Sequence, residues 1–185
     1  MPFVLAASII VLLILFWLLI LVAMLLALFG MLTTRVPFVP VARSVIKVLQ
    51  KEFPLSSGGV LYDLGSGDGR VVIAMAQAFP EARAVGVEKA PLPYLLSRLK
   101  LFFKKRKNAK FLYEDFSNVT LSDATHVYLY LFPDVVQKLI PTFEAELQHG
   151  AQVVSCDFPF QDREPARTIA VGRGRNAYTL YVYEF

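Results

Sequence analysis

The chain has 185 residues, enough for one domain of ordinary size, and 56% of them are hydrophobic. Because an average soluble domain is roughly 45–50% apolar, the composition excludes a protein that is soluble throughout. The formal net charge is +4, and the single cysteine, Cys156, excludes an intramolecular disulfide. No Cys/His cluster has the spacing of metal ligands, so no metal is expected.

The hydrophobic excess lies at the N-terminus, where residues 1–34 contain no charged side chain. A helix of this length would measure about 50 Å at ~1.5 Å per residue, and the hydrocarbon core of a bilayer is about 30 Å thick. Basic residues follow it at Arg35, Arg43, Lys47 and Lys51, and such residues favour the cytoplasmic side. We therefore predict a transmembrane anchor in the lipid bilayer, with the remaining chain facing the cytoplasm or an equivalent inner compartment.

Two other interpretations of this segment fit less well. A cleaved signal peptide would have a basic start and an apolar stretch of only about 7–15 residues. A buried core helix would carry a polar stripe, whereas Ser8 is the only polar side chain before Thr33.

After the anchor, the helical spacing of apolar residues between Val41 and Phe53 predicts a short amphipathic helix that ends before Pro54. We assign residues 35–56 to this connecting helix and its loop, and residues 57–185 to a folded domain.

Strand-like and helix-like segments alternate in this domain. The predicted strands are 60–64, 82–88, 110–113, 124–132 and 151–156, and the predicted helices are 70–79, 92–103 and 134–149. The segments 166–171 and 177–183 predict a terminal antiparallel hairpin. The pattern implies an α/β fold: a Rossmann-like, doubly wound, mostly parallel sheet with its ligand site at the carboxyl ends of the strands.

The sequence DLGSGDGR, from Asp63 to Arg70, joins the first predicted strand to the following helix. It contains three glycines in the pattern GxGxG: Gly65, Gly67 and Gly69. Glycines permit a tight turn and close approach of the backbone to a ligand. A dinucleotide-binding turn would have Gly or Ala in place of Arg70, and the acidic Asp63 and Asp68 disfavour phosphate. These carboxylates suit S-adenosylmethionine, which carries an ammonium and a sulfonium.

Further candidate residues stand at the ends of the next two strands. Glu88 ends the second strand, where a carboxylate accepts hydrogen bonds from two ribose hydroxyls. Asp115 and Phe116 follow the third strand and would offer adenine a hydrogen-bond acceptor and an apolar wall. Each residue alone is also typical of a solvated strand end or a turn, but their order predicts one shared adenosyl site.

The motifs YDLGSGDGR, VGVEKAP and YEDF resemble those of class I, seven-β-strand, S-adenosylmethionine-dependent methyltransferases over Val60 to about Phe160. The N-terminal helix and the stretches YLFPDVV and GAQVVSCDFPF more narrowly resemble membrane-anchored protein-lysine methyltransferases of mitochondria and their prokaryotic relatives. The cofactor-binding residues that the resemblance implies are Asp63, Gly65, Ser66, Gly67, Asp68, Gly69, Glu88, Lys89, Asp115 and Phe116. Lys89 stands where the family pattern has Asn.

The resemblance also implies methyl transfer to a lysine of a membrane-associated protein by in-line displacement, with no obligatory catalytic side chain. The fold builds its acceptor pocket after the fourth and fifth strands. The substrate-pocket candidates there are Tyr130, Phe132, Pro133, Asp134 and Phe158. The alternative is that these side chains only pack beneath the next helix.

Two other functions remain open: a methyltransferase for a small molecule such as a lipid or quinone, and a noncatalytic, membrane-tethered cofactor-binding module. The basic run from Lys104 to Lys107 either contacts anionic lipid headgroups or forms a solvated helix end. No nucleic-acid partner is expected, because no motif of a nucleic-acid reader is present.

Overall fold

The computed structural model describes residues 2–34, 39–174 and 177–185. In chain order the elements are α1 (Pro2–Thr34), α2 (Arg43–Glu52), β1 (Val60–Leu64), α3 (Arg70–Ala78), β2 (Arg83–Glu88), α4 (Pro91–Lys104), β3 (Ala109–Tyr113), the 3-10 helix η1 (Phe116–Asn118), β4 (His126–Leu129), α5 (Pro133–Glu146), β5 (Gln152–Cys156), β6 (Arg167–Val171) and β7 (Tyr178–Glu184). Arg35, which contributes to the predicted orientation, and residues 175–176 of the predicted hairpin turn lie outside the described residues.

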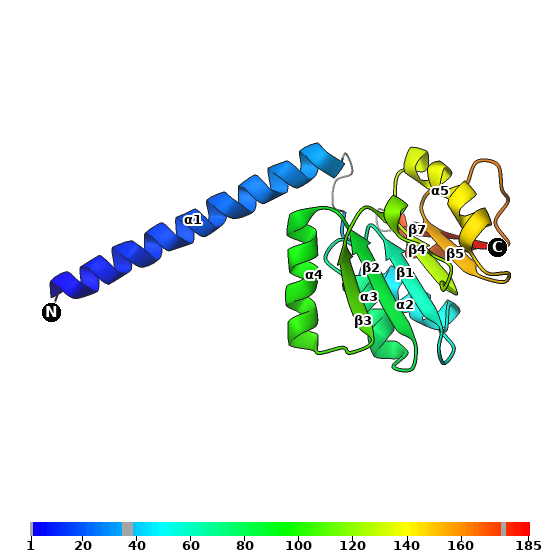
Figure 1. Cartoon of the computed structure of the whole chain (residues 1–185), viewed down its shortest axis with the longest axis horizontal. Coiled ribbons are helices and arrows are strands. Elements are labelled where there is room, and N and C mark those ends of the chain that lie inside the picture. Colours follow the sequence, from blue (N-terminus) through cyan, green and yellow to red (C-terminus); the bar gives the residue numbers. More distant parts are fainter. Residues whose placement is uncertain (1, 35–38, 175–176) are drawn as a thin grey trace.

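A seven-stranded sheet of order β3-β2-β1-β4-β5-β7-β6 forms the centre of the domain (Figure 1). Strands β1 to β5 are parallel, and β7 runs antiparallel to both β5 and β6. The mostly parallel sheet and its C-terminal hairpin are therefore confirmed. The strand order changes direction between β1 and β4, and such a switch point is where sheets of this kind bind ligands.

Helices cover both faces of the sheet. On one face, α2 and α3 pack against Leu61 of β1 and against Val154 and Cys156 of β5, all of them buried. Helix α4 adjoins α3 and β3 on the same face. Helix α5 covers the opposite face through Val136 and Phe143. Strand β1 is buried along its whole length, as expected for a parallel strand between two helical layers.

Strand β4 is shorter than the predicted strand 124–132, because it ends at Leu129. Pro133 begins α5, and a proline fits the first turn of a helix because no backbone donor is needed there. The residue before a proline avoids helical geometry, and Phe132 is accordingly extended, with φ −61° and ψ 153°. Tyr130 and Leu131 therefore leave the sheet at its carboxyl edge.

Helix α1 extends away from the domain (Figure 1). Its segment Val4–Leu26 is long and apolar enough to cross a membrane, and none of its most apolar part is buried in the protein. Helix α1 also contacts α4. The helix predicted at the N-terminus is thus present, and it meets the domain beside α4.

A buried aromatic pair fixes the chain after β5. The rings of Phe160 and Tyr183 stack with their centroids 3.9 Å apart. The backbone N–H of Phe160 donates a hydrogen bond to the Tyr183 hydroxyl at 2.8 Å. The loop that follows β5 is therefore anchored to β7.

Replacing Tyr183→Phe keeps the ring but leaves this buried N–H without an acceptor. We expect the free energy of unfolding to fall by about 1–3 kcal/mol, measured by urea denaturation of the full chain in detergent micelles. Tyr181→Phe, on the same strand and only half-buried, is the control and should lose less. Equal losses in the two variants would contradict the assigned role of the hydrogen bond.

Candidate active site

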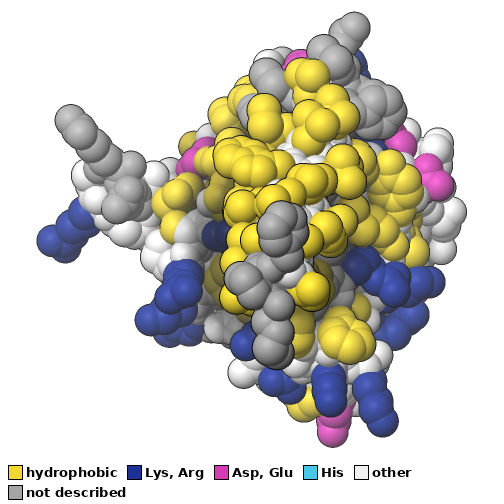
Figure 2. All heavy atoms as spheres, turned by 90° about the vertical axis from the view of Figure 1, so that its left-hand side faces the viewer, with side chains coloured by type: hydrophobic (Ala, Val, Ile, Leu, Met, Phe, Trp, Pro, Cys, Tyr) yellow, Lys and Arg dark blue, Asp and Glu magenta, His cyan; other side chains and the backbone are white. Residues whose placement is uncertain are grey.

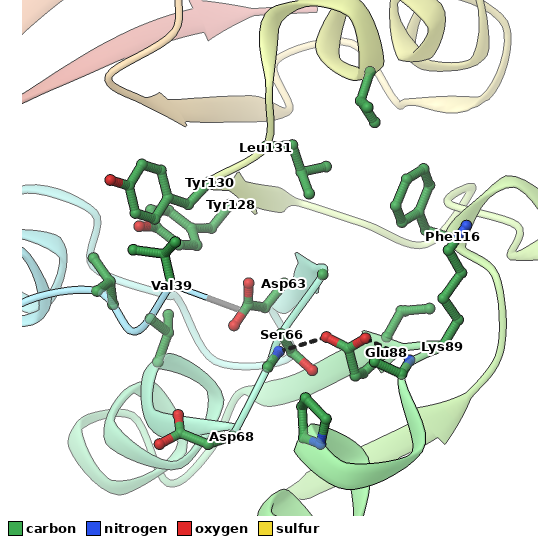
Figure 3. Close-up of a pocket in the computed structure, with 18 of the residues that line it drawn as sticks. Val39, Asp63, Ser66, Asp68, Glu88, Lys89, Phe116, Tyr128, Tyr130 and Leu131 are labelled. Atoms are coloured by element: carbon green, nitrogen blue, oxygen red, sulfur yellow. Dashed lines mark hydrogen bonds between the residues drawn. The ribbon is translucent and has the colours of Figure 1, made fainter. Parts of the chain in front are cut away.

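A cavity of about 550 Å³ lies at the carboxyl ends of the central strands (Figure 3). Its volume is within the roughly 300–1,000 Å³ of small-molecule sites. Every predicted cofactor residue except Gly69 lines it: Asp63, Gly65, Ser66, Gly67, Asp68, Glu88, Lys89, Asp115 and Phe116. The structure thus brings carboxylates at or just after the ends of three different strands into one cleft.

The glycine turn between β1 and α3 depends on backbone conformations that other residues rarely adopt. Gly65, Gly67 and Gly69 have φ angles of 78°, 55° and 75°. A Cβ atom on Gly65 would lie 2.9 Å from Leu131 Cδ2, and one on Gly69 would lie 2.3 Å from Phe111 Cζ. Gly69 therefore serves packing, whereas Gly65 and Gly67 form the cavity wall.

A fourth glycine at the site, Gly86 in β2, was not predicted. A Cβ atom there would lie 2.6 Å from Phe111 Cδ1 and 2.7 Å from Ser66 Oγ. The signal was available, because a glycine inside a strand often marks a close approach of neighbouring groups. Gly86 makes room for Ser66 beside the cavity.

Glu88 links the end of β2 to the glycine turn. Its Oε2 accepts a hydrogen bond from the Gly67 N–H at 2.9 Å, and its Oε1 accepts one from the Ala90 N–H at 2.7 Å. A carboxylate has about four lone-pair positions, so Glu88 retains capacity for ribose hydroxyls. Its side chain is held in place by these two backbone hydrogen bonds.

Asp63 is buried at the end of β1, and its carboxylate lies near that of Glu88 in the cavity (Figure 3). Burial raises the pKa of Asp63 well above its ordinary value, and the charges of Glu88 and Asp68 raise it further. A cationic group of a ligand beside Asp63 would offset both effects by stabilising the carboxylate.

Asp68 uses its charge within the protein. Its carboxylate forms ion pairs with Arg70, at 2.8 Å, and with Lys100. Burial alone would raise the pKa of Asp68, but hydrogen bonds from these two cations outweigh burial and lower it. Asp63 and Glu88 are therefore the better candidates for the negative charge that faces a ligand.

Lys89, Asp115 and Phe116 form the other end of the cavity. Lys89 Nζ donates to Asp115 Oδ2 at 2.9 Å, and the same Nζ lies 6.0 Å from the centre of the Phe116 ring. Burial would raise the pKa of Asp115, but the hydrogen bonds from Lys89 and Ser117 lower it. Asp115 therefore remains a charged acceptor beside the apolar ring of Phe116.

Two buried polar atoms indicate that the cavity suits a polar ligand. Ser66 Oγ and the Tyr128 hydroxyl have no hydrogen-bond partner within the described part of the chain, and both residues line the cavity. A buried polar group without a partner costs about 1–3 kcal/mol, and a bound ligand removes that cost. The donor set therefore fits a cofactor with an ammonium, ribose hydroxyls and an adenine.

The order of the strands, the glycine turn after β1 and the acidic Glu88 at the end of β2 together define a class I methyltransferase that uses S-adenosylmethionine. A model of the ANTKMT methyltransferase domain matches residues 63–167. Because this match covers more than half of the sequence, the chain belongs to the ANTKMT methyltransferase domain family.

Individual relatives agree with this class. A protein-lysine N-methyltransferase from Saccharolobus islandicus is 33% identical, and the match covers 80% of this chain and 93% of the relative. A lysine N-methyltransferase named for the ATP synthase, from Rattus norvegicus, is 37% identical over 80% of this chain and 66% of its own length. A crystal structure described as an RNA methyltransferase from Salinibacter ruber, solved with S-adenosylhomocysteine, is 35% identical, covers 79% of this chain and 93% of that chain, and superimposes with a TM-score of 0.72.

The substrate-side candidates divide into two groups. Tyr130 lines the cavity, whereas Phe132, Pro133, Asp134 and Phe158 do not. Phe158 lies beside Tyr130, with ring centroids 6.3 Å apart, and Phe132 lies 6.0 Å from Phe158. The three aromatic residues form a cluster beside the cavity, which we call the aromatic cluster.

Several lining residues had not been predicted: Leu26 of α1, Val39 before α2, and Leu131, Val135 and Lys138 in and before α5. Helical periodicity places Val135 and Lys138 on a helix but does not show which end of that helix meets a cavity. No sequence signal indicated that Leu26 would reach the site.

The chain contributes to methyl transfer mainly by positioning and by excluding water. Bound S-adenosylmethionine supplies an activated methyl group on a sulfonium. Asp63 and Glu88 line the cavity with carboxylates, and Tyr130 lines it with an aromatic ring. Burial, followed by the charge of Asp157, raises the pKa of Tyr130 to about 12, so this hydroxyl keeps its proton at neutral pH.

If these carboxylates bind the cofactor, Asp63→Ala and Glu88→Ala each weaken S-adenosylmethionine binding at least tenfold, about 1.4 kcal/mol. Isothermal titration calorimetry on the full chain measures the dissociation constant. Asp162→Ala removes an exposed carboxylate outside the cavity and should leave the constant unchanged. Unchanged affinity in both cavity variants would contradict the assigned site.

The raised pKa of Asp63 also predicts a pH dependence. The cofactor ammonium favours the ionised carboxylate, so binding releases a proton and affinity increases as pH rises towards the raised pKa of Asp63. Without cofactor, Asp63 ionises at lower pH in the unfolded chain than in the folded one, so folded stability falls as pH rises above 3.8, the ordinary value, through the raised pKa. Asp63→Asn should remove both dependences, measured by calorimetry and by thermal unfolding between pH 5 and 7, where roughly all of the cofactor ammonium is protonated. A wild-type pH profile retained by the Asn variant would assign the proton to another group.

Proposed function

We propose that this protein is a membrane-anchored protein-lysine methyltransferase that modifies a membrane-associated protein. Residues 1–34 serve as the anchor, residues 35–56 connect it, and residues 57–185 form the methyltransferase domain, which faces the cytoplasm or an equivalent inner compartment. The basic residues after the anchor, Arg43, Lys47 and Lys51, support this orientation.

The observation that carries the proposal is the position of Leu26. This residue ends the candidate membrane span, Val4–Leu26, and also lines the cavity that contains Asp63 and Glu88. The cofactor site consequently lies where the span meets the domain. The anchor would hold the site next to the membrane, where the effective concentration of membrane-associated targets is high.

Lysine is the acceptor best supported by the relatives and by the cavity. The names of the relatives describe lysine N-methyltransferases, among them ones named for the ATP synthase and for the adenine nucleotide translocase. A lysine must lose its proton before it can attack a methyl group, and an apolar environment assists this loss by disfavouring the ammonium. Tyr130 and the apolar side chains of Leu131 and Val135 line the cavity together and provide such an environment.

One experiment separates this proposal from its alternatives. Membranes from a strain that lacks the gene are incubated with the full chain in detergent and S-adenosylmethionine labelled in its methyl group. We expect the label in a protein, removable by protease and located on a lysine by mass spectrometry. Label removed by ribonuclease would instead indicate RNA, as in the name of the Salinibacter relative, and label extracted into organic solvent would indicate a lipid or quinone.

The cofactor-site variant Glu88→Ala is the negative control and should leave the membranes unlabelled. If cofactor binding produces heat in calorimetry but the wild type transfers no label, the chain is a noncatalytic cofactor-binding module and the proposal is wrong. If there is neither binding heat nor label, the cofactor site is wrong as well.

Tyr130 provides a sharper test of the acceptor side. We expect Tyr130→Ala to lower kcat/KM for the methyl acceptor about tenfold or more. The acceptor would lose its contact with the aromatic ring, which contributes about 1–3 kcal/mol of binding free energy. The dissociation constant for S-adenosylmethionine should stay within about twofold. Tyr130→Phe retains the ring and should retain most activity, and a loss as large as that of the Ala variant would point to the hydroxyl instead.

A further inference from the structure

Helix α4 turns its apolar side away from the protein. Leu95 and Leu99 are 51% and 54% exposed, and Phe102 and Phe103 are each 71% exposed. These residues, with Leu96, recur at helical spacing and form one stripe, which we call the outer face of α4. The inner side of the helix instead presents Pro93 and Ser97, which are buried.

A close contact at the glycine turn limits which side chain α4 can present there. A Cβ atom on Gly69 would lie only 2.9 Å from Ser97 Cβ, so α4 needs a small side chain where it meets this turn. The most exposed apolar side chains lie on the opposite side, whereas Tyr94 and Leu101 pack against the domain. In a soluble domain the apolar stripe of a surface helix normally faces the core, and a contiguous exposed apolar patch marks an interaction surface.

Positive charge surrounds the outer face. Residues 91–107, which comprise α4 and the following turn, contain no acidic residue. The basic residues exposed here are Arg98, Lys104, Lys105 and Lys107. Figure 2 views the molecule from the side on which α1 projects, so the hydrophobic side chains at its centre include those of α1, and Lys and Arg side chains lie around its lower margin. A helix with an apolar stripe and basic flanks is typical of a segment that lies in the interface of an anionic bilayer.

The membrane span leaves the protein on this same side. Helix α1 contacts α4, and Figure 1 shows α1 extending away from the side of the domain that α4 occupies. Helix α4 lies across the direction of α1 rather than along it (Figure 1). If α1 crosses a bilayer, the outer face of α4 is directed towards the surface of that bilayer.

From these observations we propose that the outer face of α4 is a second membrane contact, which lies flat in the headgroup region of an anionic bilayer. The inference rests on the membrane anchor of the proposed function. Leu95, Leu99, Phe102 and Phe103 insert at the boundary of the acyl chains, and the flanking basic residues bind lipid phosphates. The domain is thereby held at a fixed orientation on its tether.

This contact also determines where the active site opens. Leu92 and Leu96 of α4 line the cavity together with Leu26 of α1. When α4 lies on the bilayer, this part of the cavity wall adjoins the lipid surface. An acceptor group must then approach along the membrane rather than from the bulk solvent.

Tryptophan quenching in nanodiscs tests the contact. The full chain carries one native tryptophan, Trp17 in α1, which reports on the anchor. The double variant Trp17→Phe with Phe102→Trp moves the reporter to α4. The chain with native Trp17 and the double variant are each reconstituted at one chain per disc, so that a second copy cannot cover α4. The discs contain phosphatidylcholine and phosphatidylglycerol with brominated acyl chains. We expect quenching and a shift of emission to shorter wavelength at position 102.

The matched control is Trp17→Phe with Ala145→Trp, which places the reporter at an exposed position of α5 on the opposite face of the sheet. It should not be quenched. Quenching of Trp17 without quenching at position 102 would overturn the α4 contact and leave the anchor intact. Absence of quenching at Trp17 would instead overturn the anchor and the α4 contact with it.

A charge variant tests the basic margin. Lys104→Gln, Lys105→Gln and Lys107→Gln are combined in the position-102 reporter chain, and quenching there should decrease, as it should for the unaltered reporter chain in discs of phosphatidylcholine alone. The corresponding change made in the chain with native Trp17 should leave quenching of Trp17 unaffected. Equal quenching at position 102 with and without these charges would overturn the role assigned to anionic lipid.

Discussion

The packing of one aromatic ring, Phe111, against two glycines is the constraint on which the site depends. A Cβ atom on Gly69 or on Gly86 would lie 2.3 Å or 2.6 Å from this ring, and the ring is itself buried in the sheet. The turn after β1, the strand β2 and the strand β3 are consequently locked together. Glu88, two residues after Gly86, meets the Gly67 N–H because of this packing. A larger side chain at either glycine would move the binding groups as well as the core.

The same cleft concentrates negative charge where the free protein cannot easily solvate it. Asp63 is buried close to two other carboxylates, and the pKa of Asp63 is raised as a result. Asp68 avoids this cost through Arg70 and Lys100, whereas Asp63 has no such cation in its contacts within the described residues. Local conflicts of this kind concentrate at functional sites, where a ligand supplies the missing interaction. The free protein is therefore less stable at this point than the cofactor-bound protein.

Much of this architecture could be predicted from the sequence, because its signals are local. Strand β1 coincides with the predicted strand 60–64, since a buried parallel strand is a short apolar run that ends in a glycine turn. The cofactor residues could be predicted as a group because parallel strands end at one edge of the sheet. The assignment of Asp68 was less complete, because its pairing with Lys100 joins residues 32 positions apart.

Other features depend on contacts that no local pattern contains. The sequence predicts α4 as amphipathic, but it does not show that Ser97, rather than the apolar stripe, meets the glycine turn. The entry of Leu26 into the cavity follows from the packing of α1 beside α4. Phe132 stands next to the cavity rather than in it, because Pro133 begins α5 immediately after this residue, and Phe158 packs beside Phe132. In each case, contacts between distant segments determine where a side chain lies, and the local sequence does not show it.

Cys156 at the end of β5 has a practical consequence. It is the only cysteine of the chain, and burial, followed by the charge of Asp157, raises the pKa of its thiol to about 12. Thiolates rather than thiols react with maleimides and peroxides, so the native chain is nearly inert to both at neutral pH. A cysteine introduced at the surface can therefore carry a spectroscopic label while the native thiol stays in place.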